Sequence, residues 1–201
     1  MSIAAAINGP VRAVPAGLIY VGSLIYTLWL FWLGIDGQLG PNPVEALEHA
    51  LGEAALYMLV AGLVVTPVRR FSGISLLKFR RAIGLSCFFF VLVHLLTWAV
   101  LDVQALDRVW ADILKRPYIT VGMAAFILMV PLALTSNNAS VRRLGTSWRQ
   151  LHKLTYPIAF LGGLHYLMLV KGWQVRPMIF LAIILLLLFV RFKQKARSPK
   201  T

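Results

Sequence analysis

The chain has 201 residues, 59% of them hydrophobic and 13% charged, and its mean hydropathy is +0.77. The apolar excess lies in blocks long enough to cross a bilayer, which leaves no room for a soluble catalytic module. The net charge of +13 would suit nucleic acid, but its distribution along the loops argues otherwise, and the single cysteine excludes a disulfide framework and a thiolate metal cluster.

The first part of the chain predicts a leader and two helices. Residues 1–16 are mostly small. The block at 17–34 is too long for a signal-peptide core and no cleavage site follows it, so we interpret it as a retained helix. A loop rich in glycine, proline and acids precedes the second block, 50–68, which carries His49 and Glu53 at its entrance.

Two further apolar blocks predict the third and fourth helices. The third, 82–101, contains His94. Pro117 opens the fourth block, which ends near Thr135, because the first turn of a helix tolerates a residue without an N–H. Pro131, late in this block, predicts a kink.

The fifth membrane-length stretch is Trp148–Lys171, with His152 near its start and His165 near its end. Histidines inside a membrane are costly to bury, so each is a candidate functional residue. At about 1.5 Å per residue the two lie roughly 20 Å apart, most of a bilayer core. A sixth block, 177–192, is followed by a basic tail that we expect to be disordered.

The charges separate between the two sides of the membrane if the six blocks cross in alternation. Of the 20 lysines and arginines, five lie on the side of the loops at 34–49, 102–116 and 171–176, together with all seven acids. The other fifteen lie on the side of the termini. Because short loops rich in lysine and arginine stay in the cytoplasm, both termini are predicted to be cytoplasmic. The positive charge then faces anionic lipid, and we expect no nucleic-acid partner.

The predicted fold is therefore an all-α membrane protein, a bundle of six transmembrane helices. We divide it into a cytoplasmic leader at 1–16, a transmembrane domain at 17–192 and a basic cytoplasmic tail at 193–201.

Two histidines fall at one depth in this topology. His94 lies eight residues before Asp102, and His165 lies six residues before Lys171, both near the outer exits of their helices. Two neutral imidazoles on neighbouring helices at one depth can bind haem iron from opposite faces, which gives a low-spin, electron-transferring b-type haem.

The glycines Gly162 and Gly163, just before His165, would let a flat macrocycle approach the backbone. The alternative is that His94 or His165 only hydrogen-bonds to a neighbouring helix as a packing contact. Their matched depth favours the haem interpretation.

The remaining histidines are less clearly placed. A second haem at His152 would need a partner about thirteen residues before the histidine of the third helix, where the sequence has Arg80 and Arg81. Thirteen helical residues also turn His152 away from the other histidine of its helix unless Pro157 rewinds the helix. A solvated His152 is an equal alternative, and for His49 an exposed first-turn residue is favoured over a ligand.

Three segments together resemble a known family. They are GPNPVEALEHALGEAAL in the first outer loop, RRAIGL followed by LVHL on the third helix, and RRLGTSWRQLHKLTY followed by HYL on the fifth. These motifs resemble the haem-binding membrane subunits of the periplasmic methionine sulfoxide reductase system, the MsrQ (formerly YedZ) family, over nearly all of residues 10–195. That family belongs to a ferric-reductase-like group that includes the NADPH oxidases.

The resemblance implies a six-helix, multi-pass cytochrome b of the bacterial inner membrane. It implies electrons taken from the quinone pool or a flavin donor, with FMN as a possible cofactor. It also implies delivery to a periplasmic molybdopterin-containing reductase that repairs oxidised methionine. The chain would then be an electron-transfer subunit and not a complete enzyme.

The resemblance also assigns residues. The family's haem-associated histidines fall on His94, His152 and His165. The wider group has two histidines on each of two helices, whereas this chain has one on its third helix, so one haem is expected and two remain an alternative. Since the sequence ends shortly after the sixth helix, we expect no flavin and nicotinamide domain like that of the oxidases.

The alternative from another functional class is a small transporter or assembly protein whose histidines serve packing or proton relay. Such proteins carry charged or interrupted helices in the middle of the membrane. The predicted helices carry no carboxylate at that depth, which favours the electron-transfer interpretation.

Overall fold

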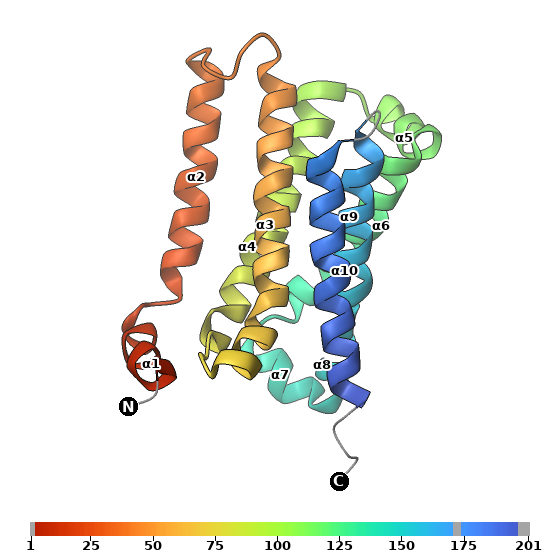
Figure 1. Ribbon diagram of the computed structural model, residues 1–201. Coiled ribbons are helices and arrows are strands. Elements are labelled where there is room, and N and C mark those ends of the chain that lie inside the picture. The colour runs from red at the N-terminus through yellow and green to blue at the C-terminus, as the bar shows by residue number, and fades with distance from the viewer. Residues whose placement is uncertain (1–2, 171–173, 197–201) are drawn as a thin grey trace.

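The computed structural model describes residues 3–170 and 174–196, with side chains for 4–170 and 174–192. Every regular element in these ranges is a helix (Figure 1). The α-helices are α1 (Ile3–Ala13), α2 (Gly17–Ile35), α3 (Pro43–Ser72), α4 (Arg80–Leu96), α5 (Leu106–Lys115), α6 (Pro117–Leu134), α7 (Asn138–Leu144), α8 (Thr146–Leu151), α9 (Thr155–Leu169) and α10 (Val175–Ala196). Three short helical segments join them: η1 (Leu77–Phe79), η2 (Thr97–Val103) and η3 (His152–Leu154).

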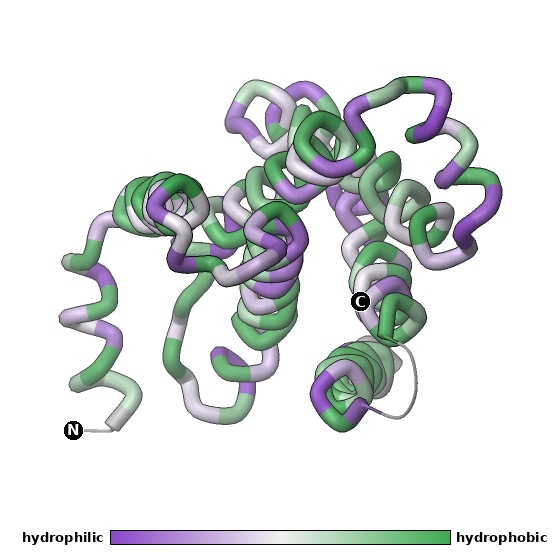
Figure 2. The backbone as a smooth tube through the Cα atoms, turned by 90° about the horizontal axis from the view of Figure 1, so that it is seen from above, coloured by the Kyte–Doolittle hydropathy of each residue, from purple (hydrophilic) through white to green (hydrophobic). Residues whose placement is uncertain are grey.

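Five helical segments of the described residues are long and apolar enough to cross a membrane: α2, α3, α4 together with η1 and η2, α6 and α10. α9 is shorter, with 15 residues, and lies beside α6 and α10 in the bundle (Figure 1). Seen from above, the helices are coloured largely for apolar residues along their length (Figure 2). Many of these apolar side chains are exposed. On α2, for example, Leu24, Ile25 and Leu28 are more than half exposed. Side chains of this kind need lipid around them, so the chain is a multi-pass membrane protein.

The bundle is built from two closely packed helix pairs, α3 with α4 and α6 with α9, which also meet each other. α10 covers α9 and α3, and α2 lies against α3 and α4 at the other side. One core cluster joins Leu56 and Leu63 of α3 to Ala159 of α9 and Ile184 of α10. The two pairs therefore form a four-helix centre, and two of the candidate histidines, His94 and His165, lie on its helices.

Pro67 lies inside α3 and leaves the carbonyl of Leu63 without its usual helical donor. The Arg191 guanidinium of α10 fills this position, with Nη2 donating to the Leu63 oxygen at 2.8 Å and to the Gly62 oxygen at 3.1 Å. Arg191 is only 8% exposed. A buried arginine thus satisfies a carbonyl that a proline has freed, which is how proline is tolerated in a membrane helix.

Several predicted boundaries were wrong. α3 begins at Pro43 and not near residue 50, so Glu53 lies ten residues beyond its first residue instead of at its entrance. α10 runs to Ala196, so the first residues of the expected disordered tail are helical. The rest of the tail, 197–201, and residues 171–173 of the last outer loop lie outside the described residues.

The predicted loops contain further helices. The link at 102–116 holds α5, and the link at 136–150 holds α7 and most of α8. α5 is amphipathic, with Leu106, Trp110 and Leu114 exposed along one stripe. This is typical of a helix that lies in the membrane interface.

Candidate functional site

The structure brings His94 and His165 together from the two helix pairs. His94 lies near the end of α4 and His165 near the end of α9. Their ring centroids are 6.3 Å apart, and the ring planes are inclined by 77°. The equal depth predicted from sequence therefore corresponds to two rings that lie near each other in an edge-to-face arrangement.

His94 rests on α3, its partner in the first helix pair. Its Nδ1 lies 2.9 Å from the backbone oxygen of Glu48. A Cβ added at Gly52, one turn further along α3, would lie 3.4 Å from that same Nδ1. The small residue at 52 gives the imidazole room to reach the carbonyl.

His165 rests on α6 in the same way. Its Nδ1 lies 2.7 Å from the backbone oxygen of Tyr118. A Cβ at Gly122 would lie 2.8 Å from Nδ1 and 2.9 Å from Cε1 of His165, closer than real Cβ contacts come. Only glycine fits at 122 with the ring in this position.

The two histidines thus have matching supports, a backbone carbonyl and a glycine four residues later on the neighbouring helix. A carbonyl acceptor at Nδ1 places the imidazole proton on that nitrogen and leaves Nε2 with a free lone pair. Neither Nε2 has a hydrogen-bond partner among the described residues. Each ring is held as a histidine ligand to a metal is held.

The spacing of the rings fits iron between them. With metal–nitrogen bonds of about 2 Å and a ring radius of about 1 Å, two opposed imidazoles have centroids about 6 Å apart. The 6.3 Å separation agrees with this value. These residues therefore suit a haem with two imidazole ligands, which Nε2 of His94 and Nε2 of His165 would hold.

The backbone next to His94 is also unusual. Three residues after the histidine, the winding changes from α to π over η2, and π turns occur frequently at functional sites. Among the described residues, the buried Thr97 hydroxyl at the start of η2 has no hydrogen-bond partner, and neither has one carboxyl oxygen of Glu48. Buried polar atoms without partners are rare in native proteins. One of these two lies three residues after His94, and the other belongs to the residue whose backbone oxygen contacts the His94 ring.

The expected role of Gly162 and Gly163 was wrong. A Cβ at Gly162 would lie 3.3 Å from Leu59 of α3, and one at Gly163 would lie 3.0 Å from both Leu181 and Ile184 of α10. These glycines let neighbouring helices approach α9. The glycines beside the histidine rings are Gly52 and Gly122, and sequence reasoning missed both because they lie on other helices.

His152 lies in η3, outside the spans and apart from the other pair. Its ring stacks on Trp148 at 3.9 Å between centroids, and its Nε2 lies 3.1 Å from the Thr135 hydroxyl. Partial burial, and then the charge of Arg80, lower the pKa of His152, so the ring is neutral at pH 7. No second histidine pairs with it in the described part of the chain.

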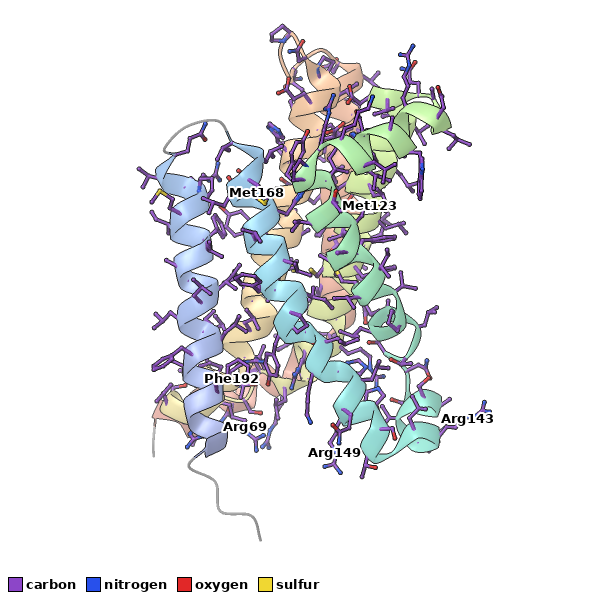
Figure 3. All side chains as sticks on the ribbon, turned by 90° about the vertical axis from the view of Figure 1, so that its right-hand side faces the viewer. Arg69, Met123, Arg143, Arg149, Met168 and Phe192 are labelled. Carbon is purple, nitrogen blue, oxygen red and sulfur yellow. The ribbon has the colours of Figure 1, made fainter. Side chains whose placement is uncertain are left out.

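The remaining candidate, His49, is exposed. Three labelled arginines lie at the end of the bundle away from the histidine pair. Arg69, Arg143 and Arg149 lie at the same end as Phe192, whereas Met123 and Met168 lie toward the opposite end (Figure 3). Met168 follows His165 by three residues, and Met123 follows Gly122, which lies against the His165 ring.

Comparison with known proteins adds independent findings. The family model "Ferric reductase like transmembrane component" matches residues 51–163. This range includes His94 and His152 and ends two residues before His165. No solved structure matches the chain.

Curated relatives match over most of their length. The chain is 48% identical, over 187 residues, to the "Protein-methionine-sulfoxide reductase heme-binding subunit MsrQ" of Brucella ovis, covering 90% of this chain and 84% of the relative. Proteins of the same name from Brucella canis and Brucella melitensis biotype 2 match with the same identity and coverage.

Proposed function

This chain belongs to the MsrQ family of heme-binding subunits of protein-methionine-sulfoxide reductase, within the ferric-reductase-like transmembrane group, and from that premise we propose how its own residues serve electron transfer. The chain is a haem-containing membrane subunit that passes electrons for methionine sulfoxide reduction. The observation that carries the assignment of residues is the opposed pair His94 and His165.

His94 and His165 would hold the iron through Nε2, while the carbonyls of Glu48 and Tyr118 hold the imidazoles in place through Nδ1. When bound, a haem with two axial histidines supplies one-electron transfer at a low-spin iron. Because both rings are fixed by backbone groups, little rearrangement accompanies a change in iron charge. A rigid site of this kind suits rapid electron transfer.

The topology we propose has six spans, with α9 as the fifth, and both termini in the cytoplasm. The charge split between the loops supports it, as do the basic side chains at the end of the bundle that carries the C-terminus (Figure 3). In the bacterial inner membrane this arrangement places the histidine pair toward the periplasm. A periplasmic, molybdopterin-containing methionine sulfoxide reductase is the acceptor.

The donor we propose is a quinol of the membrane, with a separate flavoprotein or bound FMN as the alternative. At His152 we propose no second haem. Its Nε2 already bonds the Thr135 hydroxyl and its ring stacks on Trp148, which supports a structural role at the inner end of α9.

The test is direct. We expect the purified chain to show the reduced-minus-oxidised spectrum of a low-spin b-type haem, with one haem per chain by chemical extraction. Reconstituted with its periplasmic reductase, it should support reduction of protein-bound methionine sulfoxide. Protein without a Soret band after expression with ample haem would contradict the proposal.

A further inference from the structure

A groove of about 460 Å³ runs between α2, α3 and α4 on the surface that faces lipid. Its floor and sides are mostly apolar, including Leu18, Ile19, Met58 and Phe90. At Gly22 of α2 a Cβ would meet nothing within 4 Å, so this wall of the groove is open. An apolar molecule dissolved in the membrane can therefore enter from the side.

One end of the groove is polar. It carries Tyr26 of α2 together with Glu53 and Tyr57 of α3. The Tyr26 hydroxyl has no hydrogen-bond partner among the described residues, although Glu53 and Tyr57 lie close enough to act on it electrostatically. A hydroxyl without a partner beside a carboxylate and a second phenol can bind a ligand that both donates and accepts hydrogen bonds.

Glu53 is held in place from the far side. Arg176 of α10 binds its two carboxylate oxygens at 2.8 and 2.9 Å and also donates to the Tyr57 hydroxyl at 3.2 Å. The Tyr166 hydroxyl donates to Glu53 at 3.3 Å. Since the Arg176 side chain is 58% exposed, this cluster joins the groove to the outer surface.

The polar end also adjoins the haem ligand. Glu53 follows Gly52, the residue against which the His94 ring lies. Phe90, which lines the groove, precedes His94 by one helical turn, about 5–6 Å along α4. The Tyr26 ring contacts Phe90 edge-on at 6.0 Å between centroids. A ring bound beside Tyr26 would thus be separated from His94 by one layer of side chains.

We propose that this groove is the site where a lipid-soluble hydroquinone binds and is oxidised, with its head group hydrogen-bonded by Tyr26 and Glu53 and its tail along the apolar part. The inference rests on the proposed function and locates the electron donor's site. A saturated acyl chain would fit the apolar part but would leave the hydroxyl of Tyr26 unsatisfied. A flat ring with two hydroxyl groups can hydrogen-bond to Tyr26 and Glu53, while its apolar tail lies along the rest of the groove.

Oxidation of the hydroquinone in this groove releases electrons and protons, each of which has a destination. The hydroquinone loses two electrons and two protons and leaves as the quinone. The protons leave by way of the Glu53 cluster to the outer solvent. The electrons pass one at a time to the redox group held by His94 and His165, and finally to methionine sulfoxide, which takes up two electrons and two protons and releases water. Donor, ligand pair and acceptor then lie toward one side of the membrane, and no electron needs to pass His152.

Filling the groove tests the proposal. Gly22→Leu places a side chain in it, whereas Gly17→Leu, at a glycine on the same helix that is equally free of neighbours but does not line the groove, is the matched control. The readout is labelling of the purified haem protein by a photoreactive azido-naphthoquinone, with the labelled peptides mapped. We expect labels on α2 and α3 in the native protein and in Gly17→Leu, and at least tenfold less in Gly22→Leu.

A second pair of measurements separates this proposal from the proposed function. Reduction of the haem by menadiol should fall at least tenfold in Gly22→Leu, while reduction by dithionite and the low-spin spectrum stay unchanged. Tyr26→Phe, which removes one hydrogen bond, should raise the KM for menadiol by about 3- to 10-fold. Undiminished labelling and menadiol reduction in Gly22→Leu would overturn the groove as the quinol site. The haem assignment would then still stand on the spectrum.

Discussion

At the scale of single residues, the site depends on two glycines as much as on two histidines. Gly52 and Gly122 each leave open the helical carbonyl one turn earlier, and a histidine of the paired helix bonds to it. The positions of His94 and His165 along their predicted helices indicated that the two residues lie at the same depth in the membrane. Those positions could not predict the contacts with Gly52 and Gly122, because such contacts depend on which helices lie side by side.

The His165 ring lies closer to Gly122 than the His94 ring lies to Gly52, so an alanine should have a larger effect at position 122 than at position 52. Gly122→Ala would place Cβ 2.8 Å from the ring of His165, so the ring must move and the iron site should lose much of its haem or change its midpoint potential. Gly52→Ala, with a contact of 3.4 Å, should have a small effect. Haem content and potentiometric titration measure both, with Gly17→Ala as the control. An equal effect of all three changes would contradict the packing argument.

Substitution of His152 tests whether the chain binds one haem or two. Because its ring is bonded to Thr135 and stacked on Trp148, His152→Ala should leave haem stoichiometry and the low-spin spectrum nearly unchanged and only lower thermal stability. Quantitative haem extraction checks this. Loss of about half the haem would instead establish His152 as a ligand to a second haem.

At the scale of the helices, apolar blocks located the five membrane-length helices but not their ends, and the predicted fifth block, 148–171, is divided among α8, η3 and α9. Apolar runs report lipid exposure, so amphipathic stretches such as α5 and the polar first turns of α3 fall outside them. The shift of the start of α3 to Pro43 has a functional consequence. It moves Glu53 from the helix entrance into the bundle, where it pairs with Arg176.

Arg191 of α10 donates to the carbonyl that Pro67 frees in α3, and this pairing can be tested through its effect on stability. Arg191→Met removes the donors to the Leu63 carbonyl, so it should lower the free energy of unfolding by about 1–3 kcal/mol. In a Pro67→Ala background the restored helical N–H serves that carbonyl, and the cost of Arg191→Met should shrink. Thermal unfolding in detergent of the two single variants and the double variant measures this coupling. Additive losses would show that the arginine and the proline are not linked.

At the scale of the whole molecule, the topology follows from charge. We expect a reporter that fluoresces only in the cytoplasm to be bright after Thr201 and dark when inserted in the loop between α2 and α3, because lysine and arginine are concentrated on the side of the termini. The reverse pattern, at full-length expression, would place the histidine pair near the cytoplasm.

In the proposed topology, exposed acidic residues lie on the side of the membrane where the reductase would dock. Asp36, Glu45 and Asp107 are exposed there and form no ion pair among the described residues. Neutralising the three together should slow electron delivery to the periplasmic reductase at low salt and matter little at high salt. Asp112→Asn is the control, since Asp112 already pairs with Arg116 at 3.2 Å. If the rate of electron delivery in the triple variant equals the native rate at every ionic strength, this surface is excluded as the docking site.

If one haem lies between His94 and His165, the electron paramagnetic resonance spectrum of the oxidised protein reports how the two imidazoles are arranged about the iron. With imidazole planes inclined by 77°, we expect the strongly anisotropic low-spin signal of near-perpendicular axial ligands. That signal should vanish in His94→Ala and in His165→Ala and persist in His152→Ala. A low-spin signal that survives at full haem occupancy in either of the first two variants would exclude this pair as the axial ligands.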